Sequence, residues 1–319
     1  MSAFTIFAEN FLNALMVGLL VGFLYGLMAV GLGMVYGIMR IVNFAHAELL
    51  VFGMFLAYLF YSKFGITAPL GVYAGPFAAA FMAGPVLFVF SAILYQLVIA
   101  PVSGMRAFGT RQEGHAGQFI MTLGVSLILA NGGQIIFGSM PHSIRTPMSS
   151  SAWAFELYAN GPMLFFNQAR VSAAVVAVFV AAALYLLLEY TRLGKALRGA
   201  ANNPVAATYV GINVNRAYLI AFSIGCSITG ICGGLMAPTI SFTTFTGIDF
   251  IIIMYAGVTL GGLGSIMGAF WGGMTIGMVQ QLSSLVLPAQ LQNASIFVVF
   301  LLIVVLRPQG FFGRIAERA

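Results

Sequence analysis

Long, uninterrupted apolar runs dominate this sequence and restrict what it can fold into. Apolar blocks of about 18 residues or more recur along the chain, and a helix of that length crosses a hydrocarbon core of roughly 30 Å. Only 6% of the residues are charged, too few to cover a water-facing surface. The blocks are continuous rather than alternating, which favours helices over a β-barrel. The chain is therefore predicted to be an all-α, polytopic membrane helix bundle.

The breaks between the apolar runs predict about nine transmembrane helices, with roughly eight to ten as the acceptable range. Together they form a single transmembrane domain over residues 1–319. Gly261, Gly262 and Gly264 join the seventh and eighth segments, which could instead be one broken element. The expected helices cover residues 11–37, 42–61, 77–100, 118–137, 171–190, 216–237, 250–263, 266–287 and 290–306.

The basic residues predict the orientation of the bundle, because Lys and Arg are retained on the cytoplasmic side. We place loop 191–215 in the cytoplasm and let the nine helices cross the membrane in alternating directions. Of the 13 basic residues, only Lys63, Arg145 and Arg170 then lie on the external side of the membrane. The N-terminus is then outside and the C-terminus inside. Segment 138–170 becomes external, as a solvated loop or as a docking surface for a partner. The ten residues expected inside are Arg40, Arg106, Arg111, Arg192, Lys195, Arg198, Arg216, Arg307, Arg314 and Arg318.

The net charge of +6 is therefore explained by basic residues that set the orientation of the helices in the membrane. No basic patch is interleaved with aromatic residues, so no nucleic-acid partner is expected. Cys226 and Cys232 fit neither a redox pair nor a metal site, and we expect both to be small packing residues.

Glycine recurs at every fourth position in two places. Such rows let helix backbones approach closely in lipid, where packing drives association. We expect both rows to serve helix packing. They consist of Gly18, Gly22 and Gly26, and of Gly264, Gly268 and Gly272.

A polar cluster stands at the start of the second predicted helix. In it, Asn43 and His46 are three residues apart, and Arg40 and Glu48 are eight apart, so each pair is expected to share a helical face. Glu48 is expected about 10 Å inside the membrane, counted from Ile41, where a carboxylate is costly unless paired, protonated or hydrated. The cluster either ties helices together or lies beside the translocation path, with Asn43, His46 and Glu48 as its gate. A proton relay is a weaker alternative.

Loop 191–215 is longer than a connecting turn. It predicts a short helix from about Pro204 to Val210, capped by Asn203 and ended by Gly211. A small, partly apolar helix outside the membrane suits insertion into a groove on another protein. Alternatively, it lies on the lipid surface.

Several catalytic patterns are missing. No G-x-x-x-x-G-K-[ST] phosphate loop occurs, and Gly262-Leu-Gly264 fails the dinucleotide pattern. The three histidines lack zinc spacing. The chain is expected to be no enzyme and to bind no metal or cofactor. Besides a transporter subunit, a self-contained secondary transporter or channel is an alternative, although Glu48, Glu189 and Asp249 offer it few ion sites. A scaffold without a path would leave the polar cluster unexplained.

Four stretches, spread in order along the whole chain, together resemble the permeases of branched-chain amino acid ABC transporters, and more narrowly the H-type subunit of the paired H and M permeases. The first runs from Tyr25-Gly-Leu through Met34-Val-Tyr-Gly37 to Arg40-Ile-Val-Asn-Phe-Ala-His46 and Glu48. The others are Gly194-Lys-Ala-Leu-Arg198 with Gly211-Ile-Asn213, Gly261-Gly-Leu-Gly-Ser265, and Arg307-Pro-Gln-Gly-Phe311.

This resemblance implies a bacterial inner-membrane subunit that moves a small polar or amphipathic solute by alternating access. Its implied partners are a second permease (M-type, or a second copy), two ATP-binding subunits that use ATP-Mg, and a periplasmic solute-binding protein. Loop 191–215 would then be the coupling loop that contacts an ATPase. Its implied coupling residues are Arg198, Asn203, Pro204, Tyr209, Val210 and Gly211.

Overall fold

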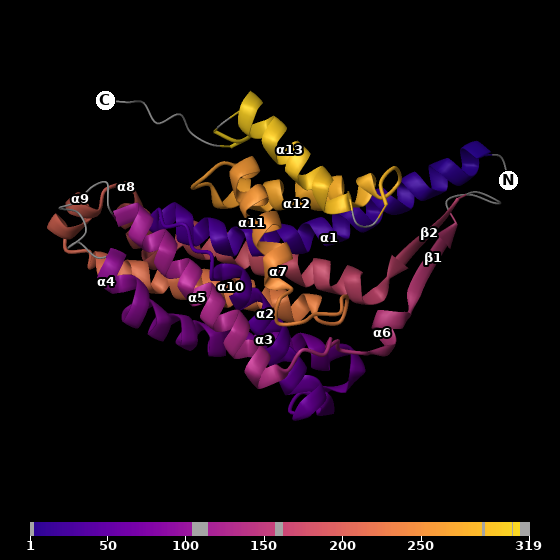
Figure 1. Ribbon diagram of the computed structural model, residues 1–319, viewed down its shortest axis with the longest axis horizontal. Helices are drawn as coiled ribbons and strands as arrows, with labels where there is room; N and C mark the ends of the chain where they lie inside the picture. The colour runs from indigo at the N-terminus through magenta and orange to yellow at the C-terminus, as the bar shows by residue number, and fades with distance from the viewer. Residues whose placement is uncertain (1–2, 104–113, 157–161, 289–290, 308, 313–319) are drawn as a thin grey trace.

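The described chain is a helix bundle with one small hairpin (Figure 1). The computed structural model describes residues 3–103, 114–156, 162–288, 291–307 and 309–312. Five helices in it are long and apolar enough to cross a membrane, and further apolar helices are shorter. The predicted all-α membrane bundle is confirmed, apart from the hairpin.

Each of the nine expected segments corresponds to an apolar helix among the described residues. The apolar helices are α1 (Ala3–Met39), α2 (His46–Tyr58), α3 (Gly71–Leu94), α5 (Gly114–Phe137), α7 (Gln168–Tyr190), α10 (Val214–Met236), α11 (Gly247–Gly261), α12 (Ile266–Ser283) and α13 (Gln292–Leu306).

Shorter elements extend or join these helices. π-helical turns prolong α2 and α3, and a 3-10 turn precedes α3. The short elements are the turns Leu59–Lys63, Ala68–Leu70 and Tyr95–Ile99, helices α4 (Ala100–Ser103), α6 (Pro147–Ser150), α8 (Arg192–Asn202) and α9 (Pro204–Tyr209), and strands β1 (Ala152–Glu156) and β2 (Met163–Asn167). The strands pair antiparallel, with Ala152 opposite Asn167 and Glu156 opposite Met163.

Several helices begin at other residues than predicted, and the first already begins at Ala3 rather than 11. The second helix begins at His46 rather than 42, because Arg40 has φ of 55° and the chain from residue 40 to 45 is not helical. The third begins at Gly71 rather than 77. Its Pro76 lies within the helix, which membrane helices tolerate when neighbouring groups satisfy the freed backbone carbonyl.

The first glycine row lies against α12. A Cβ on Gly22 would come 2.6 Å from the carbonyl oxygen of Met274, and one on Gly26 would come 2.7 Å from that of Phe270. Gly18 faces Met278 in the same way, so α1 and α12 run antiparallel in close contact. Small side chains at this contact are what lipid-embedded helices use to approach closely.

The second glycine row does not face the first. Gly268 and Gly272 contact Gly261 and Gly257 of α11, and Gly264 lies in the turn before α12, with φ of 98°. The two rows therefore serve different contacts. Gly273 and Gly277, which were not singled out from the sequence, are the α12 glycines that face α1.

The two ends of the bundle carry different structures. Helices α8 and α9 lie at one end of the long axis, whereas β1, β2 and the N-terminal end of α1 lie at the other (Figure 1). Loop 191–215 and segment 138–170 therefore occupy opposite ends, as predicted from the charges. Four of the basic residues that were expected on the cytoplasmic side are not among the described residues, and neither are residues 157–161 of the external segment. These four are Arg106, Arg111, Arg314 and Arg318.

The contact between α1 and α12 predicts opposite effects for two glycine substitutions. Gly22→Ala places a methyl group against the α12 backbone, so we expect a loss of about 1–3 kcal/mol in stability. Gly124→Ala in α5 is the matched control, because no atom lies within 4 Å of its Cβ position. It should hold or raise stability, since alanine favours helices over glycine by about 1 kcal/mol. Melting temperatures of the purified chain in detergent test both, and equal melting temperatures would contradict the close contact.

Candidate functional site

His46 is fully enclosed where α2 meets α10. Its Nε2 lies 2.7 Å from the Thr229 hydroxyl, which donates to the Gly225 carbonyl at 3.0 Å. Because that hydroxyl proton is used, Nε2–H of His46 donates to Thr229, and Nδ1 is left to face the Cys226 thiol at 3.8 Å. In this conformation His46 joins two helices and contacts no solvent.

Helix α1 leaves space for the His46 and Thr229 side chains. A Cβ on Gly31 would come 2.1 Å from the Thr229 hydroxyl oxygen. Only glycine fits there, so three helices meet around one imidazole. Cys226 and Cys232 are both free and buried in α10, which confirms the prediction that they are small packing residues.

Asn43 lies in the non-helical segment before α2. Its side chain is fully buried, and Oδ1 accepts a hydrogen bond from the Ala45 N–H at 3.1 Å, while its carbonyl accepts one from His46 at 3.3 Å. Two predictions are therefore wrong, because residues 40–45 are not helical. Asn43 and His46 do not share a helical face, and neither do Arg40 and Glu48. Asn43 instead stabilises an irregular backbone segment, which at membrane depth must be enclosed by protein.

Glu48 is buried between α2, α5 and α11, with an exposed fraction of 3%. Its Oε1 accepts from the Ser126 hydroxyl at 3.3 Å, whereas Oε2 has no hydrogen-bond partner. A Cβ on Gly247 would come 2.9 Å from Oε2, so the carboxyl group lies against the first turn of α11. The ion pair in the described chain joins Arg198 and Glu189, far along the sequence. An intramembrane carboxyl group without a basic partner is a candidate functional site.

The partners of these residues were missed in the sequence. Thr229, Ser126 and Gly247 each stand in an apolar helix as small residues. Their only sequence signal is a small or hydroxyl-bearing residue in a membrane segment, which is common in such helices. Only the tertiary contacts distinguish them from other small residues.

Helix α11 is too short to cross a membrane. Its 15 residues reach about 22 Å, against a core of roughly 30 Å. Residues 237–246 lead into it without a regular helix. Half-helices with irregular connections are the elements from which membrane transporters build solute sites.

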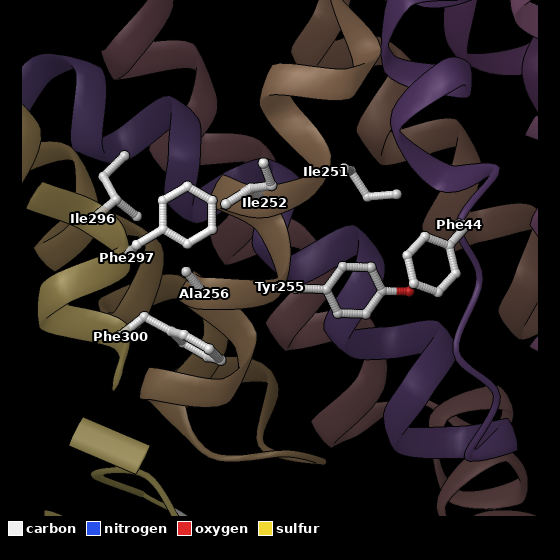
Figure 2. A pocket seen from close by; sticks show the side chains of 8 residues that line it. All are labelled: Phe44, Ile251, Ile252, Tyr255, Ala256, Ile296, Phe297 and Phe300. Carbon is white, nitrogen blue, oxygen red and sulfur yellow. The ribbon is translucent and has the colours of Figure 1, made fainter. Parts of the chain in front are cut away.

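An apolar cavity of about 260 Å³ lies beside α11. Figure 2 shows Phe297 and Phe300 of α13 on one side of it and Tyr255 and Phe44 on the other. The rings of Phe44 and Tyr255 are 5.5 Å apart, and the Tyr255 hydroxyl is buried without a partner. Phe44, which follows the buried Asn43, thus forms one wall of this cavity.

The predicted helix in loop 191–215 is confirmed as α9. The Asn203 side chain accepts from the Ala206 N–H at 3.0 Å, Pro204 occupies the first turn, and Gly211 follows with φ of 85°. Val210, just past the helix, is 77% exposed, so this end of the bundle presents apolar surface. Tyr209 beside it is 86% exposed.

Helix α8, which was not predicted from the sequence, fixes α9 to the bundle. Arg198 pairs with Glu189 of α7, and a Cβ on Gly194 would come 2.0 Å from the Leu188 carbonyl oxygen. On the other side, Asn213 caps α10 by accepting from Arg216 N–H at 3.0 Å. A cavity of about 350 Å³ lies between α9 and α10. Helices α8 and α9 are therefore attached to both α7 and α10.

At the opposite end, Asn13 of α1 holds the hairpin. Its Nδ2 donates to the Met163 carbonyl and its Oδ1 accepts from the Phe165 N–H, both at 2.9 Å. Trp153 and Phe155 of β1 are exposed. Segment 138–170 is thus a structured element in its described part.

A bundle of apolar helices, with polar groups enclosed at membrane depth and a helical loop at one end, defines a multi-pass membrane transport protein. Residues 14–306 match the family described as branched-chain amino acid transport system permease component. The chain belongs to this family, and it is a permease of an ABC importer that works with other ABC components.

Relatives match along nearly the whole chain. The high-affinity branched-chain amino acid transport system permease protein BraD of Pseudomonas aeruginosa is 29% identical over 309 residues, covering 96% of each chain. LivH of Escherichia coli, with the same description, is 26% identical and covers 95% of this chain and 96% of its own. The xylose/arabinose import permease protein XylH of Sulfolobus acidocaldarius is 29% identical over 58% of this chain and 50% of its own. No solved structure matches significantly.

The hydrogen bond between His46 and Thr229 predicts that removing the Thr229 hydroxyl group lowers the stability of the chain. Thr229→Val keeps the shape of the side chain but leaves the buried Nε2–H of His46 without an acceptor, which costs about 1–3 kcal/mol. Thr275→Val is the control, because the exposed Thr275 hydroxyl bonds only to its own helix, at Trp271. Thermal unfolding in detergent should show a lower melting temperature for Thr229→Val alone. A shift of equal size in both variants would show that His46 does not depend on Thr229.

Proposed function

We propose that this chain forms one half of the membrane channel of an ABC importer for small amphipathic solutes, with branched-chain amino acids as the leading class. The printed descriptions of BraD and LivH support this class. The match to a sugar permease over about half the chain indicates that the scaffold itself accommodates other solutes. Asn43, His46 and Glu48 are then placed beside the path as its gate.

The proposed assembly contains a second permease, either an M-type subunit or a second copy. It also contains two ATP-binding subunits and a periplasmic solute-binding protein. ATP-Mg is used by the ATP-binding subunits, and this chain binds no cofactor and catalyses no reaction. The complex lies in the bacterial inner membrane, with the C-terminus of this chain in the cytoplasm and segment 138–170 facing the binding protein.

The exposed apolar surface of α9 carries this proposal. A tyrosine and a valine that are both more than three-quarters exposed suit insertion into a groove of another protein. Movement of α9 would pass through α8 to α7 and directly to α10. Because α10 carries Thr229, it would reach His46 and the start of α2. Closure of the ATP-binding subunits would thereby change the side of the membrane to which the translocation path is open.

Acidic substitutions at α9 test the coupling. Tyr209→Asp and Val210→Asp put a charge where the proposed ATPase groove is apolar, so uptake by reconstituted complexes should fall about tenfold or more. ATP hydrolysis should persist but no longer respond to solute-loaded binding protein. Val286→Asp is the control, since Val286 is 85% exposed and follows α12 at the opposite end. Unchanged uptake and unchanged ATPase stimulation in the α9 variants would refute the coupling role.

Neutralising Glu48 tests the gate. Glu48→Gln keeps the shape of the side chain but removes the ionisable carboxyl group. If that group serves the gate, solute uptake should fall about tenfold, because membrane helices retain a buried carboxyl group mainly where it functions. The amount of assembled complex should stay unchanged. Glu156→Gln, at an exposed acid of β1, is the control. Normal uptake by Glu48→Gln would assign Glu48 to structure alone.

A further inference from the structure

Residues 141–144 form an external strap that lies against the connecting segment, residues 237–246, which leads from α10 into α11. The His142 N–H donates to the Phe242 carbonyl at 2.8 Å, and the Phe242 N–H donates to the His142 carbonyl at 2.9 Å. His142 is therefore joined by two backbone hydrogen bonds to a residue that stands five positions before Gly247, the first residue of α11.

A further hydrogen bond holds the start of the connecting segment. The Ile144 N–H donates to the Ala237 carbonyl at 3.2 Å, and the Ile144 side chain is fully buried. The external strap thus holds the connecting segment at two points, Ala237 and Phe242.

Aromatic rings surround the His142 side chain and hold the strap on the bundle. Its ring centroid lies 4.9 Å from that of Tyr58 and 5.5 Å from that of Phe55, both edge to face. Phe55 also packs edge to face on Phe242 at 5.0 Å and stacks on Phe137 of α5 at 4.2 Å. Ring pairs of this kind stabilise beyond the area that they bury. His142 therefore holds the connecting segment with its backbone and α2 with its side chain.

Between Phe242 and α11 the chain forms a hydrogen-bonded turn. The Thr243 N–H donates to the Thr246 hydroxyl at 2.8 Å, and the Thr246 N–H donates to the Thr243 carbonyl at 3.2 Å. The Ile248 N–H donates to the Phe245 carbonyl at 3.1 Å. Because these bonds restrict the turn, the position of Phe242 sets where α11 begins.

The first residue of α11 packs on the proposed gate residue Glu48. A Cβ on Gly247 would come 2.9 Å from Glu48 Oε2 and 3.0 Å from its carboxyl carbon. The Ser126 hydroxyl bonds Oε1, whereas Oε2 has no hydrogen-bond partner, and the side chain is enclosed. A shift of the first turn of α11 therefore changes the space around the Glu48 carboxyl group directly.

On its other side, the external strap continues into the structured external segment. Thr146 caps α6 by accepting from the Ser149 N–H at 3.3 Å, and the Asn167 side chain at the end of β2 donates to the Ser149 carbonyl at 2.9 Å. The hairpin is thus linked through α6 to the strap, and through the strap to the connecting segment.

We propose that His142 is a positioning residue of the gate: it holds the first turn of α11 against Glu48 and transmits displacements of segment 138–170 to that carboxyl group. This inference rests on the proposed function, in which Glu48 belongs to the gate and the external segment faces the binding protein. The route is separate from the one through α8, α9 and α10, because it reaches α11 from the external end. Docking of the binding protein then changes the space around Glu48 without passing through His46.

Thermal unfolding of the purified chain in detergent tests the contact without any partner protein. Gly247→Ala places a methyl group against the enclosed Glu48 carboxyl group and should lower the melting temperature. His142→Ala removes the ring packing and lets the connecting segment yield, so the double variant should lose less than the two single losses added together. No loss for Gly247→Ala, or additive losses in the double variant, would overturn the assignment.

Two control variants accompany this cycle. His142→Phe keeps a ring beside Tyr58 and Phe55 and should leave the loss caused by Gly247→Ala unchanged. Gly22→Ala, at the contact of α1 with α12, shares none of these partners, so its loss should add to that of His142→Ala. Equal non-additivity with Gly22→Ala would show that His142→Ala loosens the whole chain and would refute the positioning role. His142→Leu replaces His142→Ala in the cycle if the latter gives no folded protein.

Uptake by the reconstituted importer gives the second readout. His142→Ala should lower the maximal rate of leucine uptake about tenfold and leave the half-saturating concentration of binding protein unchanged, and His142→Phe should retain the rate. An unchanged maximal rate would overturn the inference, and a raised half-saturating concentration alone would assign His142 to docking instead. If the unmodified complex shows no ATP-driven uptake, the proposed function fails, whereas the melting-temperature cycle still decides whether His142 positions α11.

Discussion

The absence of water from the membrane core governs this fold. Every backbone N–H and C=O at that depth needs an internal partner, so the chain forms helices and encloses each irregular segment in protein. Segment 40–45 follows this rule, because Asn43 bonds the backbone of Ala45 and His46 while being fully buried. Residues 237–246 follow it as well, with a backbone bridge between Phe242 and His142.

Close helix contact is the second consequence of the same constraint. Without a hydrophobic driving force between helices in lipid, association depends on packing and on a few hydrogen bonds. Gly22 brings α1 onto the α12 backbone, and Gly31 leaves the space that the hydroxyl of Thr229 occupies beside His46. The polar cluster and the glycine contacts are thus parts of one packing arrangement that joins α1, α2 and α10.

Much of the architecture was predictable from the sequence, because hydropathy and helix length report directly on the membrane. The nine apolar segments, the α9 cap at Asn203 and the opposite ends of the two loops follow from local pattern. The faces of the polar cluster did not, because the prediction assumed a helix through residues 42–45. A residue with positive φ at Arg40 ends α1, and arginine carries no sequence signal for that conformation.

The sequence by itself determined the class of protein, the number of apolar segments and the loop that carries α9, since each depends on short-range composition and spacing. The tertiary structure decided which glycines face which helix, that Glu48 lies against Gly247 while Asp249 stays exposed, and that Tyr25, Gln280 and Asn293 are joined by hydrogen bonds. These contacts join residues that are up to 255 positions apart, as between Tyr25 and Gln280. Periodicity reports only on neighbours within one helix, so long-range contacts become defined only when the helices pack.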